Sequence, residues 1–145
     1  MKPQTTPYSL GDRAECAFMN QLIAHGFTVS RPYSGASPYD VIVDNGRRLW
    51  RVQVRSVGHE FARRGYFRIS AFRRLGTRGK QRITAQHADF IAALVVPCAT
   101  WYIIPVGVCA RQTSFLLCPD LPGSKFDRYR EAWHLLDHDC AKTAT

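Results

Sequence analysis

Hydrophobic positions near the start of the chain recur at the spacing of an α-helix, from about Ser9 to His25, and Gly26 follows where a left-handed residue ends a helix. At about 100° per residue, the apolar stripe of this predicted helix contains Phe18, Met19 and Leu22. Glu15 falls in the middle of the stripe. A carboxylate on a buried face needs a compensating partner, so Glu15 is a candidate for chemistry.

Two runs of alternating apolar and polar residues, Tyr39–Asp44 and Leu49–Arg55, predict a pair of strands. The Asn45-Gly46 dipeptide between them is a strong signal for a β-hairpin. A two-residue loop at this dipeptide would place Asp40 opposite Arg51. The runs therefore predict an antiparallel hairpin that begins at Asp40.

Because side chains alternate between the faces of a strand, Asp40 shares one face of this hairpin with Arg51, Gln53 and Arg55. The opposite face consists of valines, Val41, Val43, Val52 and Val54. A four-residue loop preserves these faces, whereas a three-residue loop would separate Asp40 from Gln53. In the favoured register Gln53 is the diagonal neighbour of Asp40, at about 7–8 Å, which one metal ion can bridge.

The rest of the chain predicts more strands and a final helix. The expected elements are strands at Gly65–Ser70, Asp89–Val96 and Trp101–Ile104, an edge strand at Ser114–Cys118, a loop at Arg73–Arg82 and a helix at Ser124–His138. We assign Trp101 and Trp133 to the core. No repeat or linker divides the sequence, so we expect one α/β domain over residues 1–145, with a central mixed β-sheet flanked by helices.

Composition adds a preference for polyanions. The chain has 145 residues, enough for one domain, and 46% of them are hydrophobic, enough for a core. Twenty Lys and Arg against eleven Asp and Glu give a net charge of +9, and sixteen of the twenty cations are arginine. Such a charge favours nucleic acid as the partner. A GC-rich genome would also favour arginine over lysine, and this alternative stays open.

The positive charge is concentrated between Arg47 and Arg82, where only Glu60 opposes it. Within this region the candidate DNA-binding residues are Arg63, Arg64, Arg68, Arg73, Arg74, Arg78, Lys80 and Arg82. Aromatic residues lie among them. A solvated basic loop is the alternative interpretation.

Five cysteines, an odd number without metal-ligand spacing, argue against structural zinc and against a disulfide framework. Three of them, Cys98, Cys109 and Cys118, have apolar neighbours and are expected to be buried thiols. The sequence shows no signal peptide and no apolar run of about 20 residues. We therefore expect a cytoplasmic protein of the prokaryotic cytosol or nucleoid, without membrane association.

Glu15 on the first helix, Tyr39-Asp40 at the start of a strand and Gln53-Val54-Arg55 at the end of the next resemble the PD-(D/E)xK nuclease pattern. Three later segments resemble the branch of that superfamily that includes group I intron homing endonucleases, namely Ala88–Leu94, Trp101–Pro105 and Ala132–Leu136. The resemblance covers most of the chain. It implies a restriction-endonuclease-like fold and DNA cleavage, in common with Holliday-junction resolvases and restriction enzymes.

The resemblance also implies a metal site for Mg²⁺, with Mn²⁺ as a possible substitute. Asp40 would be the first ligand, and the Gln53 side-chain oxygen and the Val54 carbonyl are candidate neutral ligands, because Mg²⁺ prefers oxygen. Glu15 would supply a second carboxylate, directly or through a metal-bound water. Arg55 would hold the attacking water or the phosphate.

The sequence departs from the family pattern at two positions. Gln53 stands where Glu or Asp is usual, which removes one negative charge from the metal site. Arg55 stands where Lys is usual, and a guanidinium stays protonated, so it cannot be a general base.

Each site residue also has a structural interpretation. Glu15 could form an ion pair with Arg55 or Arg51. Asp40 could cap the preceding turn. Gln53 and Arg55 could belong to an ordinary solvated strand face.

Three functions fit these patterns. The first is a metal-dependent endodeoxyribonuclease, homing-endonuclease-like or resolvase-like, acting as a homodimer or larger homo-oligomer because one small domain covers little DNA. The second is a catalytically inactive DNA-binding module on a nuclease fold. The third is association with RNA or ribosomes through charge alone.

Overall fold

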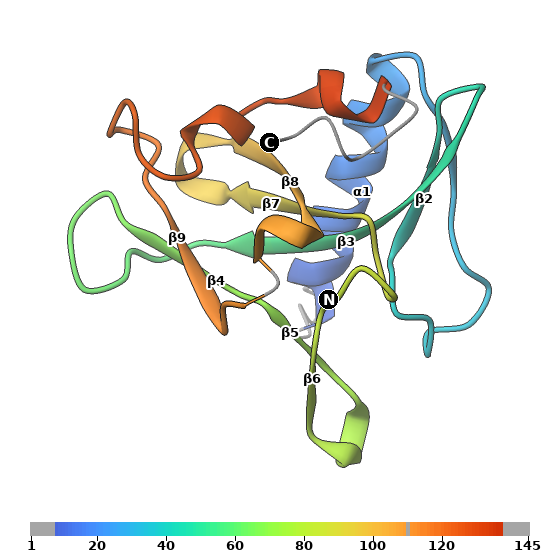
Figure 1. The fold of residues 1–145 in the computed structure, drawn as a ribbon, viewed down its shortest axis with the longest axis horizontal. Coiled ribbons are helices and arrows are strands. Elements are labelled where there is room, and N and C mark those ends of the chain that lie inside the picture. The colour runs from blue at the N-terminus through green and yellow to red at the C-terminus, as the bar shows by residue number, and fades with distance from the viewer. Residues whose placement is uncertain (1–7, 110, 138–145) are drawn as a thin grey trace, which may run out of the picture.

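The computed structural model describes residues 8–109 and 111–137 and begins with the helix α1, Tyr8–Ala24 (Figure 1). Gly26 has a φ of 87° and ends the helix in the left-handed conformation, as predicted. The buried face of α1 consists of Ala14, Phe18 and Leu22. Glu15 is only partly buried beside this face, so it lies at the edge of the apolar stripe and not in its middle.

Five strands form the central sheet, in the order β1-β2-β3-β7-β8 (Figure 1). They are β1 Thr28–Ser30, β2 Val41–Asp44, β3 Leu49–Val57, β7 Phe90–Val95 and β8 Thr100–Pro105. β3 and β7 run parallel, and the other neighbouring pairs are antiparallel, so the sheet is mixed, as predicted. β7 lies inside the sheet, which explains its continuous apolar sequence.

The loop between β2 and β3 has four residues and not the two that Asn45-Gly46 predicts. The Asn45 side chain is the reason, because its Oδ1 accepts hydrogen bonds from the backbone amides of Arg47 and Arg48, at 2.9 and 2.7 Å. Its Nδ2 donates to the Leu136 carbonyl at 2.8 Å, which ties the loop to the C-terminal segment. The loop geometry thus depends partly on a residue 91 positions away.

The longer loop shifts the register of β2 on β3 but keeps the predicted faces. Val41 pairs with Val52, and the Asp40 amide donates to the Val52 carbonyl at 3.0 Å. Asp40 therefore lies directly opposite Gln53, and not opposite Arg51 as the two-residue loop requires.

Two further strands, β4 Phe67–Ser70 and β9 Ser114–Leu117, form a separate two-stranded sheet. The predicted strand at 114–118 thus exists, but it pairs with β4 and not with the edge of the central sheet. Phe67 and Ile69 of β4 point inward and are buried, whereas Arg68 and Ser70 face outward and are exposed.

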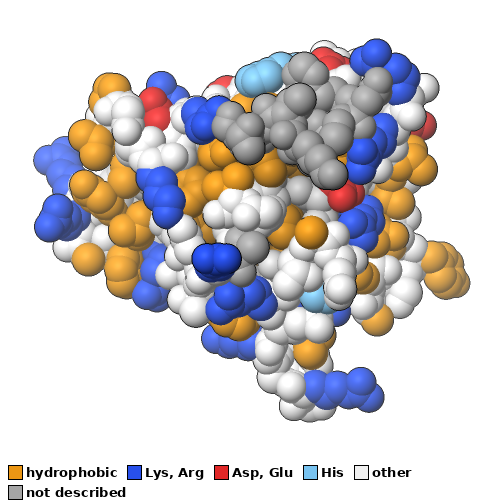
Figure 2. All heavy atoms as spheres, in the orientation of Figure 1, with side chains coloured by type: hydrophobic (Ala, Val, Ile, Leu, Met, Phe, Trp, Pro, Cys, Tyr) orange, Lys and Arg blue, Asp and Glu red, His pale blue; other side chains and the backbone are white. Residues whose placement is uncertain are grey.

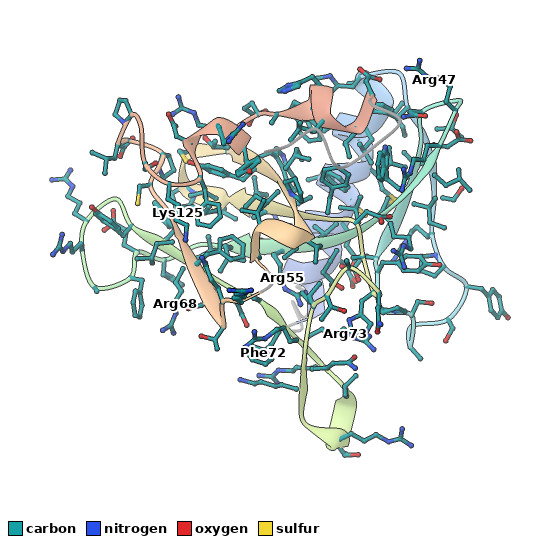
Figure 3. All side chains as sticks on the ribbon, viewed as in Figure 1. Arg47, Arg55, Arg68, Phe72, Arg73 and Lys125 are labelled. Carbon is teal, nitrogen blue, oxygen red and sulfur yellow. The ribbon has the colours of Figure 1, made fainter. Side chains whose placement is uncertain are left out.

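The predicted loop Arg73–Arg82, together with Phe72, instead forms a β-hairpin that projects from the body of the molecule (Figure 1). It consists of β5 Phe72–Arg74, the 3₁₀-helix η1 Gly76–Arg78 and β6 Lys80–Arg82. Gly79, with a φ of 93°, lets the chain turn back into β6. We call this element the basic hairpin; Figure 2 shows Lys and Arg side chains on it, and Figure 3 labels Phe72 and Arg73 at its base.

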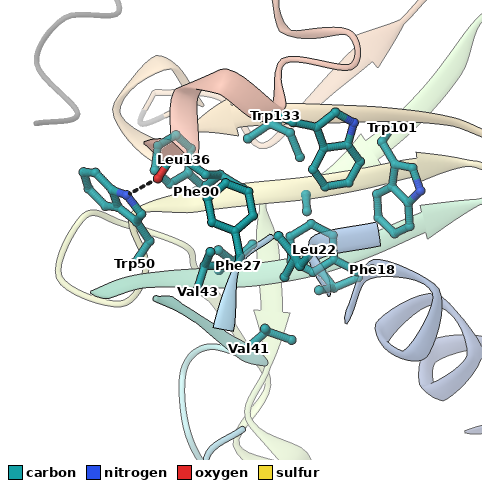
Figure 4. Close-up of a cluster of buried hydrophobic side chains, with 14 of the residues drawn as sticks. Phe18, Leu22, Phe27, Val41, Val43, Trp50, Phe90, Trp101, Trp133 and Leu136 are labelled. Carbon is teal, nitrogen blue, oxygen red and sulfur yellow. Dashed lines mark hydrogen bonds between the residues drawn. The ribbon is translucent and has the colours of Figure 1, made fainter. Parts of the chain in front are cut away.

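One buried cluster lies between α1 and the valine face of β2 and β3 (Figure 4), and a second contains residues of β7 and β8 together with residues of β4 and β9. Trp101 and Trp133 are buried in the first cluster, which confirms their assignment to the core. The Trp50 ring is also fully buried, and its Nε1 donates to the Leu136 carbonyl at 3.0 Å. The C-terminal segment therefore closes the core on the side of α1.

The predicted helix Ser124–His138 is wrong over the residues that the structure describes; His138 lies outside them. Two 3₁₀-helices replace it, η4 Asp127–Tyr129 and η5 Trp133–Asp137. Between them Glu131 has a φ of 49°, and its amide donates to the Trp101 carbonyl at 2.7 Å. Its carboxylate accepts from the Trp101 amide and from the Trp133 indole, both at 2.7 Å. Glu131 therefore forms hydrogen bonds with Trp101 of β8 in place of the backbone hydrogen bonds of an α-helix.

Two more 3₁₀-helices, η2 Val96–Cys98 and η3 Val106–Cys109, flank β8. Cys109 and Cys118 are buried free thiols, as predicted, but Cys98 is exposed in its turn. Within the described part of the chain, no helix has the length and hydrophobicity that a membrane span requires.

Candidate active site

Asp40 lies immediately before β2, and its side chain is fixed against β3. Its Oδ2 accepts a hydrogen bond from Gln53 Nε2 at 2.7 Å and another from the Val54 amide at 2.8 Å. The bonds that hold this carboxylate therefore run to β3, and not to the preceding turn as the capping interpretation requires. The position of the carboxylate follows from the strand register.

Burial raises the pKa of Asp40 above its usual value. The hydrogen bond from the Val54 amide lowers this pKa, and so do the charges of Arg55, Arg31 and Arg73, although burial outweighs them. Desolvation thus disfavours the charged form of Asp40, and a cation beside it would favour that form.

Gln53 and Arg55 do not form an ordinary solvated strand face. Gln53 is only 6% exposed and is the single buried polar residue among those described. Arg55 is partly buried, its Nη2 donates to the Phe72 carbonyl at 2.8 Å, and burial lowers its pKa while the charge of Asp40 raises it. The guanidinium therefore links β3 to the base of the basic hairpin (Figure 3).

Glu15 faces the same region from α1. Its Oε2 forms an ion pair with Arg31 Nη2 at 2.9 Å, so its partner is neither Arg51 nor Arg55. Burial raises the pKa of Glu15, the charge of Asp40 raises it further, and the charge of Arg31 lowers it. The two carboxylates line the same cleft, so the negative charge of Asp40 disfavours the ionised form of Glu15.

Two adjoining clefts contain these residues and share Asp12 and Glu15. The hairpin cleft, of about 730 Å³, is lined by α1, β3 and the basic hairpin, with the basic side chains Arg55, Arg73, Arg74 and Lys80. The loop cleft, of about 560 Å³, is lined by α1, the 31–39 segment and Asp40. The carboxylates of Asp12 and Glu15 thus line both clefts, between the basic side chains of the hairpin cleft and the 31–39 segment of the loop cleft.

The eight predicted DNA-binding residues fall into separate groups. Arg73, Arg74 and Lys80 line the hairpin cleft, and Arg78 is exposed in η1. Arg82 Cζ lies 5.7 Å from the centre of the Phe72 ring at the hairpin base. Arg63 and Arg64 lie in the 58–66 loop and Arg68 lies on β4, so these three residues are outside the basic hairpin and do not line the hairpin cleft.

Sequence patterns did not point to two relevant side chains, Asp12 and Arg31. Asp12 is one helical turn before Glu15, and that spacing is a signal that could have found it. Arg31 lies in an irregular segment that offers no such signal. Arg51, which the sequence placed on the same face as Asp40, forms an ion pair with Asp89 at 3.1 Å. It therefore connects β3 to the residue before β7 and does not line the hairpin cleft or the loop cleft.

The residues at Asp40 fit a divalent cation that prefers oxygen. Among the described residues no group of three or more His, Cys, Asp or Glu side chains is arranged to hold an ion. Two carboxylates, Asp40 and Glu15, nevertheless line the same cleft, and the amide of Gln53 contacts Asp40. Mg²⁺ needs only one or two carboxylates, since water and phosphate oxygens complete its shell.

The fold is that of a restriction-endonuclease-like protein, and the chain belongs to the PD-(D/E)XK endonuclease family, whose sequence model matches residues 5–136. The chain is similar to the bacterial homing endonuclease I-Ssp6803I, with 26% identity, a TM-score of 0.75, and coverage of 88% of this chain and 90% of that one. It also matches the Holliday junction resolvase Hjc of Archaeoglobus fulgidus, with 20% identity, a TM-score of 0.49, and coverage of 76% and 84%. No curated protein sequence matches.

Proposed function

We propose that this protein is a metal-dependent DNA endonuclease that hydrolyses phosphodiester bonds where the hairpin cleft and the loop cleft meet. The observation that carries the proposal is the Asp40 carboxylate, which is held against β3 by Gln53 and Val54 and lines the same cleft as Glu15. Family membership and the similarity to a bacterial homing endonuclease support it.

Asp40 and Glu15 would hold Mg²⁺, or Mn²⁺ in its place, with the Val54 carbonyl as a neutral ligand. Gln53 Nε2 donates to Asp40, so the Gln53 side-chain oxygen would serve as a second neutral ligand only after its amide rotates. The ion supplies a more acidic bound water and stabilises charge on the phosphate. Glu15 must then exchange its ion pair with Arg31 for the metal or for a metal-bound water. Binding two negative groups to one cation also relieves the repulsion that raises the pKa of Glu15.

Arg55 acts as a fixed positive charge and not as a base. Burial lowers its pKa and the charge of Asp40 raises it, but a guanidinium starts so far above neutral pH that it stays protonated. Its bond to the Phe72 carbonyl holds the guanidinium at the wall of the hairpin cleft, where it would stabilise charge that develops on a phosphate oxygen.

The basic hairpin would bind the DNA next to the cut. Arg74 and Lys80 are paired across β5 and β6, are exposed, and line the cleft, so both can reach phosphates. A two-stranded ribbon of this kind also fits the major groove of duplex DNA. Cutting both strands would require a second copy of the chain, because one site acts on one strand.

The direct test is cleavage of plasmid, linear and four-way-junction DNA with Mg²⁺, with Mn²⁺ and with EDTA. Wild type should cleave at least one substrate only with a divalent cation. Asp40→Asn should lower the rate by at least about 100-fold, because even the loss of a partner that only orients a metal ligand costs about 10–100-fold. Asp120→Asn, at an exposed carboxylate outside both clefts, should cleave normally. Binding without cleavage under every condition would instead support the inactive DNA-binding module.

The hairpin is tested by the salt dependence of binding. Arg74→Glu should weaken DNA binding and lower the slope of log affinity against log salt by about one for each phosphate that the variant no longer neutralises. Arg128→Glu makes the same charge change at an exposed arginine away from both clefts and should leave the slope nearer to that of wild type. Equal effects of the two variants would show that net charge, and not the hairpin, governs binding.

A further inference from the structure

A cleft of about 580 Å³ lies between the outer face of the β4–β9 sheet, the 61–66 segment and the 118–126 segment. We call it the aromatic cleft. Four aromatic rings and two cations line it, Phe61, Tyr66, Phe115, Phe126, Arg68 and Lys125. Neither Asp40 nor Glu15 belongs to it, so it is separate from the candidate active site.

Cations and rings are in direct contact in this cleft. The Arg68 guanidinium lies over the Phe61 ring, 4.0 Å from its centre, and Lys125 Nζ lies 5.4 Å from the centre of the Phe126 ring. Phe61 is 39% exposed, whereas Phe115 and Phe126 are buried and have ring centres 5.0 Å apart. The cleft thus has a buried aromatic floor and an accessible ring beside a positive charge.

The lining selects for a particular ligand chemistry. Among the described residues that line it there is no Asp or Glu, while Arg68 and Lys125 supply positive charge. Gln112 and Ser114 add groups that can form hydrogen bonds. A flat apolar ring with polar edges and an attached anion matches all three features, and an unpaired nucleotide has this composition.

The aromatic cleft is also connected to the candidate active site. Arg68 and Ser70 are two residues apart on the outward face of β4, about 7 Å along the strand. Arg68 lines the aromatic cleft and Ser70 lines the hairpin cleft. A polynucleotide strand that leaves the hairpin cleft along β4 therefore reaches the aromatic cleft.

We propose that the aromatic cleft binds an unpaired nucleotide, with the base against Phe61 and the phosphate near Arg68 and Lys125. The inference rests on the proposed function for the source of that nucleotide, a DNA strand opened or frayed beside the cut. Binding itself needs no cleavage, so it can be measured in EDTA.

The test compares a short oligothymidine with an oligonucleotide of the same length that has abasic sites, by fluorescence anisotropy in EDTA. Phe61→Ala should weaken binding of oligothymidine by about 10-fold, the effect of losing one base stack, and should leave the abasic oligonucleotide unaffected. Phe61→Trp retains an aromatic face and should bind as wild type does. Ile23→Ala, which truncates a 63% exposed side chain on α1 outside all three clefts, is the matched control and should change neither affinity.

Equal weakening for the two oligonucleotides, or none, would overturn the proposal. It would also be overturned if Phe61→Ala changed the oligomeric state in sedimentation and left oligothymidine binding intact, because a second copy would then occupy the cleft. If Phe61→Ala weakens binding of oligothymidine but not of the abasic oligonucleotide, and wild type never cleaves DNA, the proposed function fails and the nucleotide site stands. If wild type cleaves but this difference between the oligonucleotides is absent, the nucleotide site alone fails.

Discussion

Replacing Gln53 by glutamate tests the register that places this residue against Asp40. In wild type Gln53 Nε2 donates to Asp40 Oδ2 at 2.7 Å, and Gln53 is 6% exposed. Gln53→Glu would put two carboxyl groups in contact at a buried position. Two unit charges about 4 Å apart repel by about 4 kcal/mol at an effective dielectric constant of about 20, and the second carboxylate also loses its hydration.

The pair can avoid this cost by keeping one proton. Holding a proton at pH 7 on a glutamic acid with an ordinary pKa of about 4.3 costs about 1.4 kcal/mol for each of about 2.7 pH units, or about 3.7 kcal/mol. Proton uptake is therefore no more costly than ionising both groups, and it restores an O–H···O hydrogen bond. We expect Gln53→Glu to lower the free energy of unfolding at pH 7 by about 3–4 kcal/mol.

The sign of the pH dependence follows from the same reasoning. The folded variant binds more protons than the unfolded one, so its stability relative to wild type falls as the pH rises from about 4 toward 7. At pH 5 the penalty should be only about 1 kcal/mol. Burial already raises the pKa of Asp40 in wild type, which adds to the tendency to keep the proton.

Urea unfolding followed by circular dichroism, in EDTA at pH 5 and pH 7, measures both penalties. Gln86→Glu, at an exposed glutamine, is the control and should show little difference between the two pH values. Adding Mg²⁺ should stabilise Gln53→Glu more than wild type, because the variant offers the cation another carboxylate. A penalty for Gln53→Glu that is the same at pH 5 and pH 7 would refute the contact between residues 40 and 53, and with it the register.

Two other predictions concern the C-terminal segment and the cleft. Glu131→Ala should lower the free energy of unfolding by about 1–3 kcal/mol, because the Trp101 amide and the Trp133 indole lose their acceptor. Urea unfolding measures this loss, and Glu131→Gln, which keeps one acceptor oxygen, is the comparison. Arg31→Ala removes a positive charge that lowers the pKa of Glu15, so the acid limb of the cleavage pH profile should move to higher pH. If the acid limb does not move, Glu15 does not need to be ionised for cleavage.

The polar and apolar faces of β2 and β3 were predictable from the sequence because strand geometry has a period of two. Any even loop keeps Asp40 and Gln53 on one face, so the prediction survived the wrong loop length. Which residue faces Asp40 was not predictable. It depends on the side-chain bonds of Asn45 and on its contact with Leu136, which is distant in sequence.

The C-terminal segment shows a different limit. Phe126, Tyr129, Trp133 and Leu136 have helical spacing and are buried, as that spacing predicts. The backbone is nevertheless not α-helical, because Glu131 exchanges helical hydrogen bonds for bonds to β8. Periodicity reports which residues are buried, and more than one backbone conformation can bury the same residues.

By itself, the sequence determined the N-terminal helix, the central strands β2, β3, β7 and β8, the core-facing valines of β2 and β3, and the family to which the chain belongs. These features depend on local periodicity and on short motifs. Only the tertiary structure decided the ion pair of Glu15 with Arg31, the contact of Asp40 with Gln53 and the projecting basic hairpin. Each of these features depends on how elements that are distant in sequence pack together. A side chain contacts whichever group lies near it in space, and local sequence patterns do not specify that group.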